Sequence, residues 1–189
     1  MEKTVAEYIA DQLAAWGVEA VYGVPGDAIL PFIDAVENHP QLRFYGVKHE
    51  TSAAFMASAA AKLTGRIGVC TATSGPGVAN LINGLADAKN DRAPVLAVTG
   101  QVETYYFSTN YKQYIDQGML LTPVTGYSGL IIHEEAANEV TVTALRSVMT
   151  GKTPAHIGVA ADLWSRKIKR EGAIRPFEPF LQTPAQSSP

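Results

Sequence analysis

Short apolar segments with strand character alternate with helical segments along most of this chain, and this alternation restricts the fold more than any other feature. Such alternation is typical of parallel sheets with right-handed crossovers and helices on both faces. We therefore predict an α/β fold, a three-layer α/β/α sandwich around a parallel sheet of about six strands. The expected strands are residues 20–24, 42–47, 67–71, 94–99, 124–127 and 155–160. The expected helices are residues 5–16, 29–36, 51–62, 78–90 and 134–149.

Two helix starts carry recognisable capping residues. Thr4 is followed three residues later by Glu7, which predicts a capping box at the first helix. Asp27, in a Pro-Gly-Asp turn, is expected to cap the second helix.

Composition predicts one domain followed by a segment of different character. The 189 residues are 47% hydrophobic and 17% charged, which is enough for one good core. We assign residues 1–168 to a single α/β domain and residues 169–189 to a linker that leads toward a further domain. In the linker, Gln and Ser are interspersed with proline, a composition typical of extended segments. Its prolines are Pro176, Pro179, Pro184 and Pro189.

Charge and residue usage exclude several kinds of partner. The net charge is −3 and the basic residues are scattered, so we expect no nucleic-acid partner. No apolar run approaches ~18 residues, and the N-terminal region has no signal pattern, so we expect a cytoplasmic protein without stable membrane association. Cys70, the only cysteine, is expected to be a buried, inert thiol. The four histidines lack metal-ligand spacing, so no metal site is expected in this chain.

Familiar motifs of parallel α/β enzymes are missing from the sequence. No G-x-G-x-x-G follows the first strand, where Pro25 stands at a position that would need a free backbone N–H. There is also no G-x-x-x-x-G-K-[ST] loop and no G-x-S-x-G elbow. Nicotinamide chemistry, Walker-type phosphate binding and acyl transfer are therefore disfavoured.

Two strand-to-helix junctions carry the candidate site instead. Glu50 follows the strand at residues 42–47, and the turn at residues 74–77 (Ser-Gly-Pro-Gly) follows the next strand, with Asn80 one helical turn on. Ligands of parallel sheets bind outside the carboxyl ends of the strands, so these residues are expected to converge. A carboxyl in a dry crevice there is suited to exchanging a proton with a ring nitrogen.

Each candidate also has a purely structural explanation. A glutamate in the first turn of a helix commonly complements the helix dipole, and Asn80 could be a surface amide. The residues 74–77 could form an ordinary tight turn. In the long irregular segment 102–117, Tyr105, Tyr106 and Tyr111 either line a pocket or pack on the surface. The residues alone leave these alternatives open.

Several motifs, in order, resemble a known family. They are residues 22–26 (YGVPG), 47–50 (VKHE), 62–70 (KLTGRIGVC), 74–77 (SGPG) and 94–101 (PVLAVTGQ). Together they resemble the N-terminal pyrimidine-binding domain of thiamine-diphosphate-dependent enzymes, in particular pyruvate oxidases and acetolactate synthases. The similarity extends over residues 4–167, and it implies the thiamine-diphosphate-binding fold.

The resemblance implies roles for individual positions. Glu50 matches the catalytic glutamate that hydrogen-bonds N1′ of the aminopyrimidine and thereby activates the cofactor. Gln113 matches a catalytic glutamine at the substrate, while Lys112 replaces an aromatic residue and either contacts an anionic substrate or points to solvent. The positions implied in cofactor binding are Val24, Pro25, Gly26, Glu50, Thr73, Gly75, Pro76, Gly77 and Asn80.

The resemblance further implies an enzyme that decarboxylates a pyruvate-like 2-keto acid with thiamine diphosphate. The family's Gly-Asp-Gly run is missing here, so Mg²⁺ is expected in a separate diphosphate-binding domain of the same or another subunit of a homodimer or homotetramer. The intact enzyme could also contain FAD, and this chain alone is expected to be incomplete and inactive. Two alternatives remain: a stand-alone small subunit of a two-chain keto-acid decarboxylase, and a non-catalytic assembly module that retains the fold.

Overall fold

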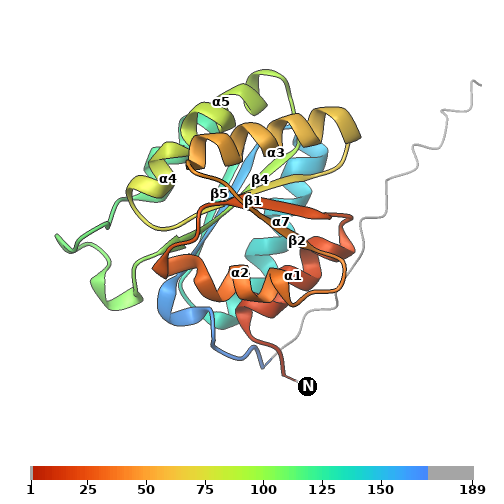
Figure 1. Cartoon of the computed structure of the whole chain (residues 1–189). Helices are drawn as coiled ribbons and strands as arrows, with labels where there is room; N and C mark the ends of the chain where they lie inside the picture. The colour runs from red at the N-terminus through yellow and green to blue at the C-terminus, as the bar shows by residue number, and fades with distance from the viewer. Residues whose placement is uncertain (1, 170–189) are drawn as a thin grey trace, which may run out of the picture.

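Six parallel strands form the central layer of the molecule, as shown in the computed structural model of residues 2–169 (Figure 1). Their order in the sheet is β2-β1-β3-β4-β6-β5, and each neighbouring pair is parallel. The prediction of a parallel sheet is therefore confirmed. The strands are β1 Ala20–Gly23, β2 Arg43–Gly46, β3 Gly68–Ala72, β4 Val95–Gln101, β5 Tyr127–Ile131 and β6 Ala155–Ala160.

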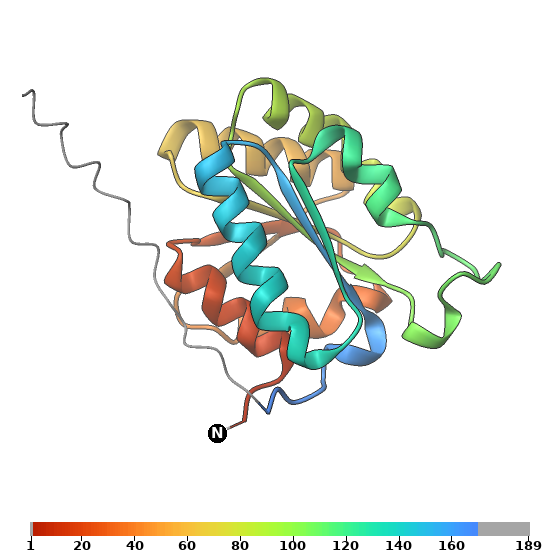
Figure 2. The same cartoon turned by 180° about the vertical axis from the view of Figure 1, so that it is seen from behind.

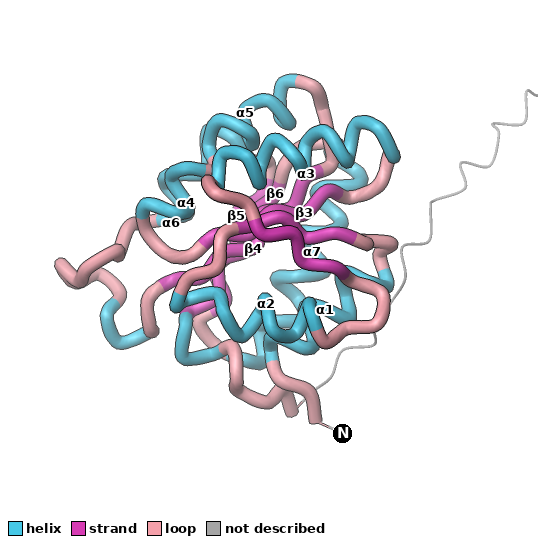
Figure 3. Tube along the Cα trace, in the orientation of Figure 1, coloured by secondary structure: helices cyan, strands magenta, loops and turns pink. Residues whose placement is uncertain are grey.

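Helices cover both faces of this sheet, which confirms the three-layer sandwich (Figures 1 and 3). One face carries α1 Val5–Ala15, α2 Leu30–Glu37 and α7 Ala137–Gly151. The other carries α3 Glu50–Thr64, α4 Pro76–Asn80, α5 Ile82–Asn90 and α6 Gln117–Leu121. A separate hydrophobic cluster lies under each helical layer. Short 3₁₀ turns complete the fold: η1 Asp27–Ile29, η2 Thr104–Tyr106, η3 Thr122–Val124, η4 Glu134–Ala136 and η5 Ala161–Leu163.

The capping prediction is right for the first helix and wrong for the second. At α1, Glu7 N donates to Thr4 Oγ1 and Thr4 N donates to Glu7 Oε2. The hydrogen bond from the Thr4 backbone lowers the pKa of the Glu7 carboxyl. Asp27 caps nothing, because its backbone already lies in the η1 turn, whereas a capping residue needs extended backbone. The helix α2 starts only after this turn, with Pro31 in its first turn.

Two further boundaries differ from the sequence prediction. The helix expected at residues 78–90 is divided into α4 and α5 at Leu81, where the preceding Asn80 carbonyl accepts a hydrogen bond from Thr51 Oγ1. The strand expected at residues 124–127 is β5, Tyr127–Ile131. Residues 122–124 instead form the η3 turn, and Thr125 Oγ1 donates to the Leu121 carbonyl, so the chain extends only beyond that point.

The predicted linker falls almost entirely outside the part of the chain that the structure describes. Apart from Lys169, the predicted linker at residues 169–189 lies outside the described range.

Figure 2 shows the opposite side of the molecule, with α7 crossing the sheet and the segment 102–117 extending to one side. Within residues 2–169, the helices are too short or too polar to cross a lipid bilayer.

Glycine and alanine bring α3 close to its neighbours. A Cβ atom added to Gly68 of β3 would lie 2.0 Å from the Ala57 carbonyl oxygen of α3. A Cβ atom on Gly84 of α5 would lie 2.4 Å from the Ala54 Cβ atom of α3. These separations leave no space for a methyl group, so α3 is held in contact with both the sheet and α5.

We therefore expect Gly84→Ala to lower the free energy of unfolding by about 1–3 kcal/mol, although alanine favours helices, because the methyl group overpacks the α3–α5 contact. Chemical denaturation of the chain measures this. Gly46→Ala is the matched control, since its Cβ atom would have its nearest contact at 3.7 Å. Equal stability of the two variants would contradict the close-packing argument.

Two buried side chains have strongly shifted pKa values. Burial raises the pKa of the Cys70 thiol to about 12, and the residue is fully buried in β3. The expectation of a buried thiol is confirmed, and the raised pKa makes Cys70 a poor nucleophile. Burial lowers the pKa of His156 in β6 to about 3, so this imidazole is neutral in the folded protein.

The His156 shift predicts a loss of stability in acid. Below its ordinary pKa of ~6.5 the histidine takes up a proton in the unfolded chain but not in the folded one, so stability falls as pH decreases toward 3. The slope from this group approaches about 1.4 kcal/mol per pH unit. Denaturation of the chain between pH 7 and 4 should show a shallower slope in His156→Asn than in His133→Asn, in which an exposed histidine is replaced. Identical slopes would contradict this assignment.

Candidate functional site

The strand order reverses between β1 and β3, the second and third strands of the sheet. From β1 the chain passes to β2 on one side, and it then returns to form β3 on the other side. The crossover through α2 runs on one face and the crossover through α3 on the other (Figure 1). The carboxyl ends of strands beside such a reversal are the usual ligand site of open parallel sheets.

The loops that leave β1 and β3 contact each other at this point. A Cβ atom on Gly26 would lie 2.7 Å from Thr73 Cβ, so only glycine allows the two loops to approach so closely. Ala28 N also donates to Thr73 Oγ1 over 3.3 Å. The structure thus brings Gly26, one of the predicted residues 24–26, together with Thr73.

Glu50 lies at the start of α3, beside the turn after β3. The helix begins here because His49 caps it, with His49 Nδ1 accepting from Thr51 N over 3.2 Å. Asn80 Nδ2 donates to Glu50 Oε2 over 2.9 Å, and Thr51 Oγ1 donates to the Asn80 carbonyl over 2.7 Å. Asn80 is therefore a direct partner of the carboxylate, and the surface-amide explanation is wrong.

The other Glu50 oxygen faces the glycine turn. A Cβ atom on Gly77 would lie 3.2 Å from Glu50 Oε1 and equally far from Thr73 Cγ2. No residue in the described range donates a hydrogen bond to Oε1, so this oxygen can accept one from a ligand. Glu50 is half-buried in this chain, which corrects the expectation of a carboxyl in a dry crevice.

The turn at residues 74–77 is shaped around Gln113. Gly75 has φ +68° and ψ −120°, and a Cβ atom there would lie 2.6 Å from the Gln113 carbonyl oxygen. Gln113 itself has φ +64°, which is uncommon for a residue with a side chain. The irregular segment 102–117 therefore reaches the glycine turn and contacts it through its backbone.

Some of the predicted site residues have exposed side chains. Pro25, Pro76, Lys112 and the Gln113 side chain are exposed, and Lys112 forms no ion pair with the described residues. Tyr106 and Tyr111 stack with ring centroids 3.5 Å apart, and Tyr105 packs beside them with 66% of its surface exposed. These tyrosines pack on the surface of the segment.

The residues that support the loop after β1 were not among those predicted from the sequence. Trp164 Nε1 donates to the Ala28 carbonyl over 2.7 Å, and a Cβ atom on Gly100 would lie 2.1 Å from that same oxygen. A fully buried tryptophan needs a partner for its N–H group, and Trp164 comes soon after a strand. That position was the one available signal for a structural support at the carboxyl edge of the sheet.

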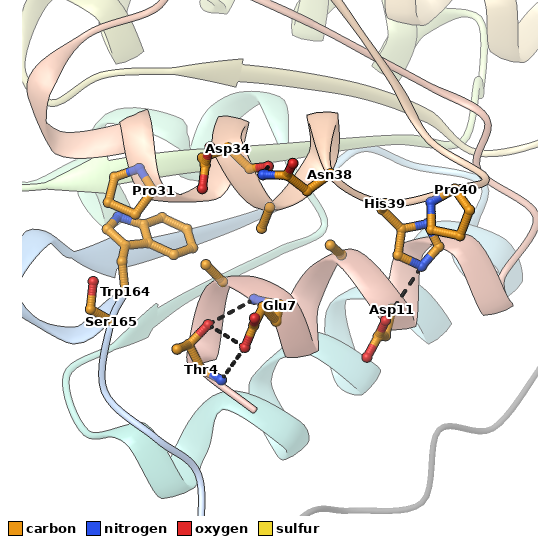
Figure 4. A pocket seen from close by; sticks show the side chains of 13 residues that line it. Thr4, Glu7, Asp11, Pro31, Asp34, Asn38, His39, Pro40, Trp164 and Ser165 are labelled. Atoms are coloured by element: carbon orange, nitrogen blue, oxygen red, sulfur yellow. Dashed lines mark hydrogen bonds and ion pairs between the residues drawn. The ribbon is translucent and has the colours of Figure 1, made fainter. Parts of the chain in front are cut away.

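A pocket of about 330 Å³ lies elsewhere, between α1 and α2 and beside Trp164 (Figure 4). None of the predicted site residues lines it. Figure 4 shows that Glu7 is held by Thr4 and that His39 reaches Asp11, so much of its polar wall is internally paired. Within residues 2–169, no group of three or more His, Cys, Asp and Glu side chains is placed to hold a metal ion.

The fold and the convergence of Glu50, Asn80 and two glycine-containing loops define a ligand-binding α/β domain of the doubly wound class. Comparison with known families identifies it further. Residues 3–120 match the family described as thiamine pyrophosphate enzyme, N-terminal TPP binding domain, and the chain belongs to this family. TPP denotes thiamine pyrophosphate, which is thiamine diphosphate.

Curated relatives agree with this assignment. The chain is 41% identical over 170 residues to the thiamine pyrophosphate-containing protein YdaP of Bacillus subtilis, covering 89% of this chain and 30% of the relative. It is 35% identical over 161 residues to the acetolactate synthase isozyme 1 large subunit of Escherichia coli, covering 85% and 29%. Identity to the acetolactate synthase of Mycobacterium avium is 41% over 131 residues, covering 69% and 21%. The chain thus spans less than a third of these relatives.

Gly75 offers a test of the contact between the turn and the segment. We expect Gly75→Ala to destabilise the chain, because its positive φ costs about 1–3 kcal/mol and its methyl group collides with Gln113. Hydrogen exchange should accelerate at residues 111–115 by more than the global loss of stability explains. Gly17→Ala, with φ +80° but nothing within 4 Å, is the control. The same exchange pattern in both variants would contradict a specific contact.

Proposed function

We propose that this chain supplies the pyrimidine side of the thiamine diphosphate site in an enzyme that decarboxylates a 2-keto acid. The observation that carries the proposal is the hydrogen bonding of the two Glu50 carboxylate oxygens. Asn80 holds Oε2, while Oε1 accepts no hydrogen bond within residues 2–169 and faces the Gly77 turn. A carboxylate held in this way can bind a protonated ring nitrogen at a fixed position.

The residues around Glu50 fit a flat heterocycle. Glycines stand in both loops of the site, and a residue without a side chain lets a ring approach the backbone. In the proposed role, Glu50 Oε1 holds the proton at N1′ of the aminopyrimidine, and Asn80 fixes the direction of the carboxylate. Residues 24–26, Thr73 and residues 75–77 flank the ring. Thiamine diphosphate, when bound, supplies the carbon nucleophile and the electron sink for decarboxylation, and the protein orients it.

The rest of the site comes from another domain in this proposal. The chain spans less than a third of its relatives and carries no Gly-Asp-Gly run, so Mg²⁺ and the diphosphate are held by a domain of the same or another subunit. Glu50 is half-buried here, which suits a surface that a second domain covers. A homo-oligomer provides such a covering surface if the two halves come from different subunits.

The substrate side of the proposal rests on the segment that contacts Gly75. Gln113 and the neighbouring Lys112 lie next to the glycine turn, and an exposed lysine there can pair with the carboxylate of a 2-keto acid. The acetolactate synthase relatives support a keto acid as the substrate class. Pyruvate is therefore the first substrate to test, with and without added FAD.

Glu50→Gln tests the proposed role. In the complete enzyme we expect thiamine-diphosphate-dependent consumption of pyruvate to fall by roughly two orders of magnitude or more, because the amide cannot exchange the proton at N1′. The melting temperature should stay close to that of the unmodified protein. Glu37→Gln, at an exposed position in α2, is the matched control and should keep full activity. Near-normal turnover of Glu50→Gln would remove the proposed role.

A further inference from the structure

A chain of hydrogen-bonded polar side chains, buried except for the half-buried Ser128, connects three strands to the end of the segment that contains Gln113. It runs from Ser128 in β5 through His156 in β6 and Thr99 in β4 to Gln117, the first residue of α6. Each of the three links is 2.8 Å long. Thr99, His156 and Gln117 are at most 2% exposed, so water does not compete for the two hydrogen bonds that join these three side chains.

The partners fix the direction of every hydrogen bond in this chain. Gln117 Nε2 donates to the Gly100 carbonyl over 2.8 Å, so its Oε1 must face Thr99 and accept. Thr99 Oγ1 donates its only proton in that bond and therefore accepts a hydrogen bond from His156 Nε2. His156 Nδ1 then accepts from the Ser128 hydroxyl. The imidazole is neutral, as its lowered pKa requires.

Space is also reserved for the Gln117 side chain. A Cβ atom on Gly158 of β6 would lie 2.8 Å from Gln117 Oε1, although the backbone of Gly158 does not require glycine. Because residue 158 has no side chain, the Gln117 amide can pack against the sheet at this point and reach Thr99.

A second buried glutamine makes the reciprocal connection. Gln101, at the end of β4, donates from Nε2 to the Ile115 carbonyl over 2.8 Å, while its Oε1 accepts from Val102 N over 2.9 Å. The strand therefore holds residue 115 of the segment, and Gln117 of the segment holds the strand at Gly100. The start of the segment is held separately, by Asp162, which accepts from Thr104 N and Thr104 Oγ1.

We propose that Thr99 and Gln117 are positioning residues that set Gln113 against the Gly75 turn. Gln113 lies two residues before Ile115, which Gln101 holds, and the backbone of Gln113 is in contact with Gly75. The segment from Gln113 to Ile115 is therefore held at both ends, by Gly75 and by Gln101, and such a short segment has few conformations available. The substrate consequence of this inference rests on the proposed function, whereas the structural consequence does not.

The test compares two chemically identical substitutions at buried threonines. Thr99→Val leaves Gln117 Oε1 and the His156 N–H group without a partner, whereas Thr141→Val removes a hydroxyl that has no partner among the described residues. In the 189-residue chain, we expect hydrogen exchange at residues 111–117 to accelerate about tenfold or more in Thr99→Val, beyond any change in α7 or β1. Thr99→Ser, which keeps the hydroxyl, should exchange like the unmodified chain, and so should Thr141→Val.

Gln117→Met serves as a second variant if Thr99→Val does not fold, since it preserves side-chain length and removes both hydrogen bonds. Uniform acceleration across the sheet in either variant, or none at residues 111–117, would overturn the positioning role.

An activity measurement separates this inference from the proposed function. In the complete enzyme, Thr99→Val should raise KM for pyruvate about tenfold, with a smaller change in the thiamine diphosphate concentration that gives half activity, and Thr99→Ser should restore KM. An unchanged KM would overturn the effect on substrate. Absence of any thiamine-dependent turnover in the unmodified enzyme would overturn the proposed function, and the exchange experiment would still decide the positioning role.

Discussion

The position of α3 depends on the contact of small residues with the backbone around them. Gly68 lets the Ala57 carbonyl approach β3, and Gly84 lets Ala54 approach α5. These contacts leave α3 little freedom to shift or rotate, and Glu50 is its first residue. The position of the Glu50 carboxylate at the edge of the sheet therefore depends on close packing along α3.

The architecture was predictable because the alternation of strands and helices is a periodic signal that local residue types determine. The boundaries were less predictable. Thr4 and Glu7 form the expected capping box within one helical turn, whereas the division between α4 and α5 coincides with the hydrogen bond from Thr51 to the Asn80 carbonyl, across 29 residues of sequence. Long-range bonds of this kind leave no local pattern, so the sequence alone indicated one continuous helix.

The candidate site, like the fold, was predictable only in those features that follow from local sequence. Glu50 and the glycine turn stood out because both follow strands, and their convergence follows from the reversal between β1 and β3. The supports of the site did not stand out: Trp164, Gln117 and Thr99 are buried residues whose partners lie far away in the sequence. A buried glutamine cannot be told from a surface glutamine until its neighbours are known. The sequence therefore indicated only that the segment 102–117 is irregular.

The most direct test of the proposed role of Glu50 is a crystal structure of the complete protein with thiamine diphosphate and Mg²⁺. We expect one Glu50 carboxylate oxygen within about 2.6–3.2 Å of N1′ of the aminopyrimidine, with Asn80 still bound to the other oxygen. The rest of the cofactor should lie against a different domain. A pyrimidine ring bound away from Glu50, or a cofactor held entirely by other domains, would contradict this role of Glu50.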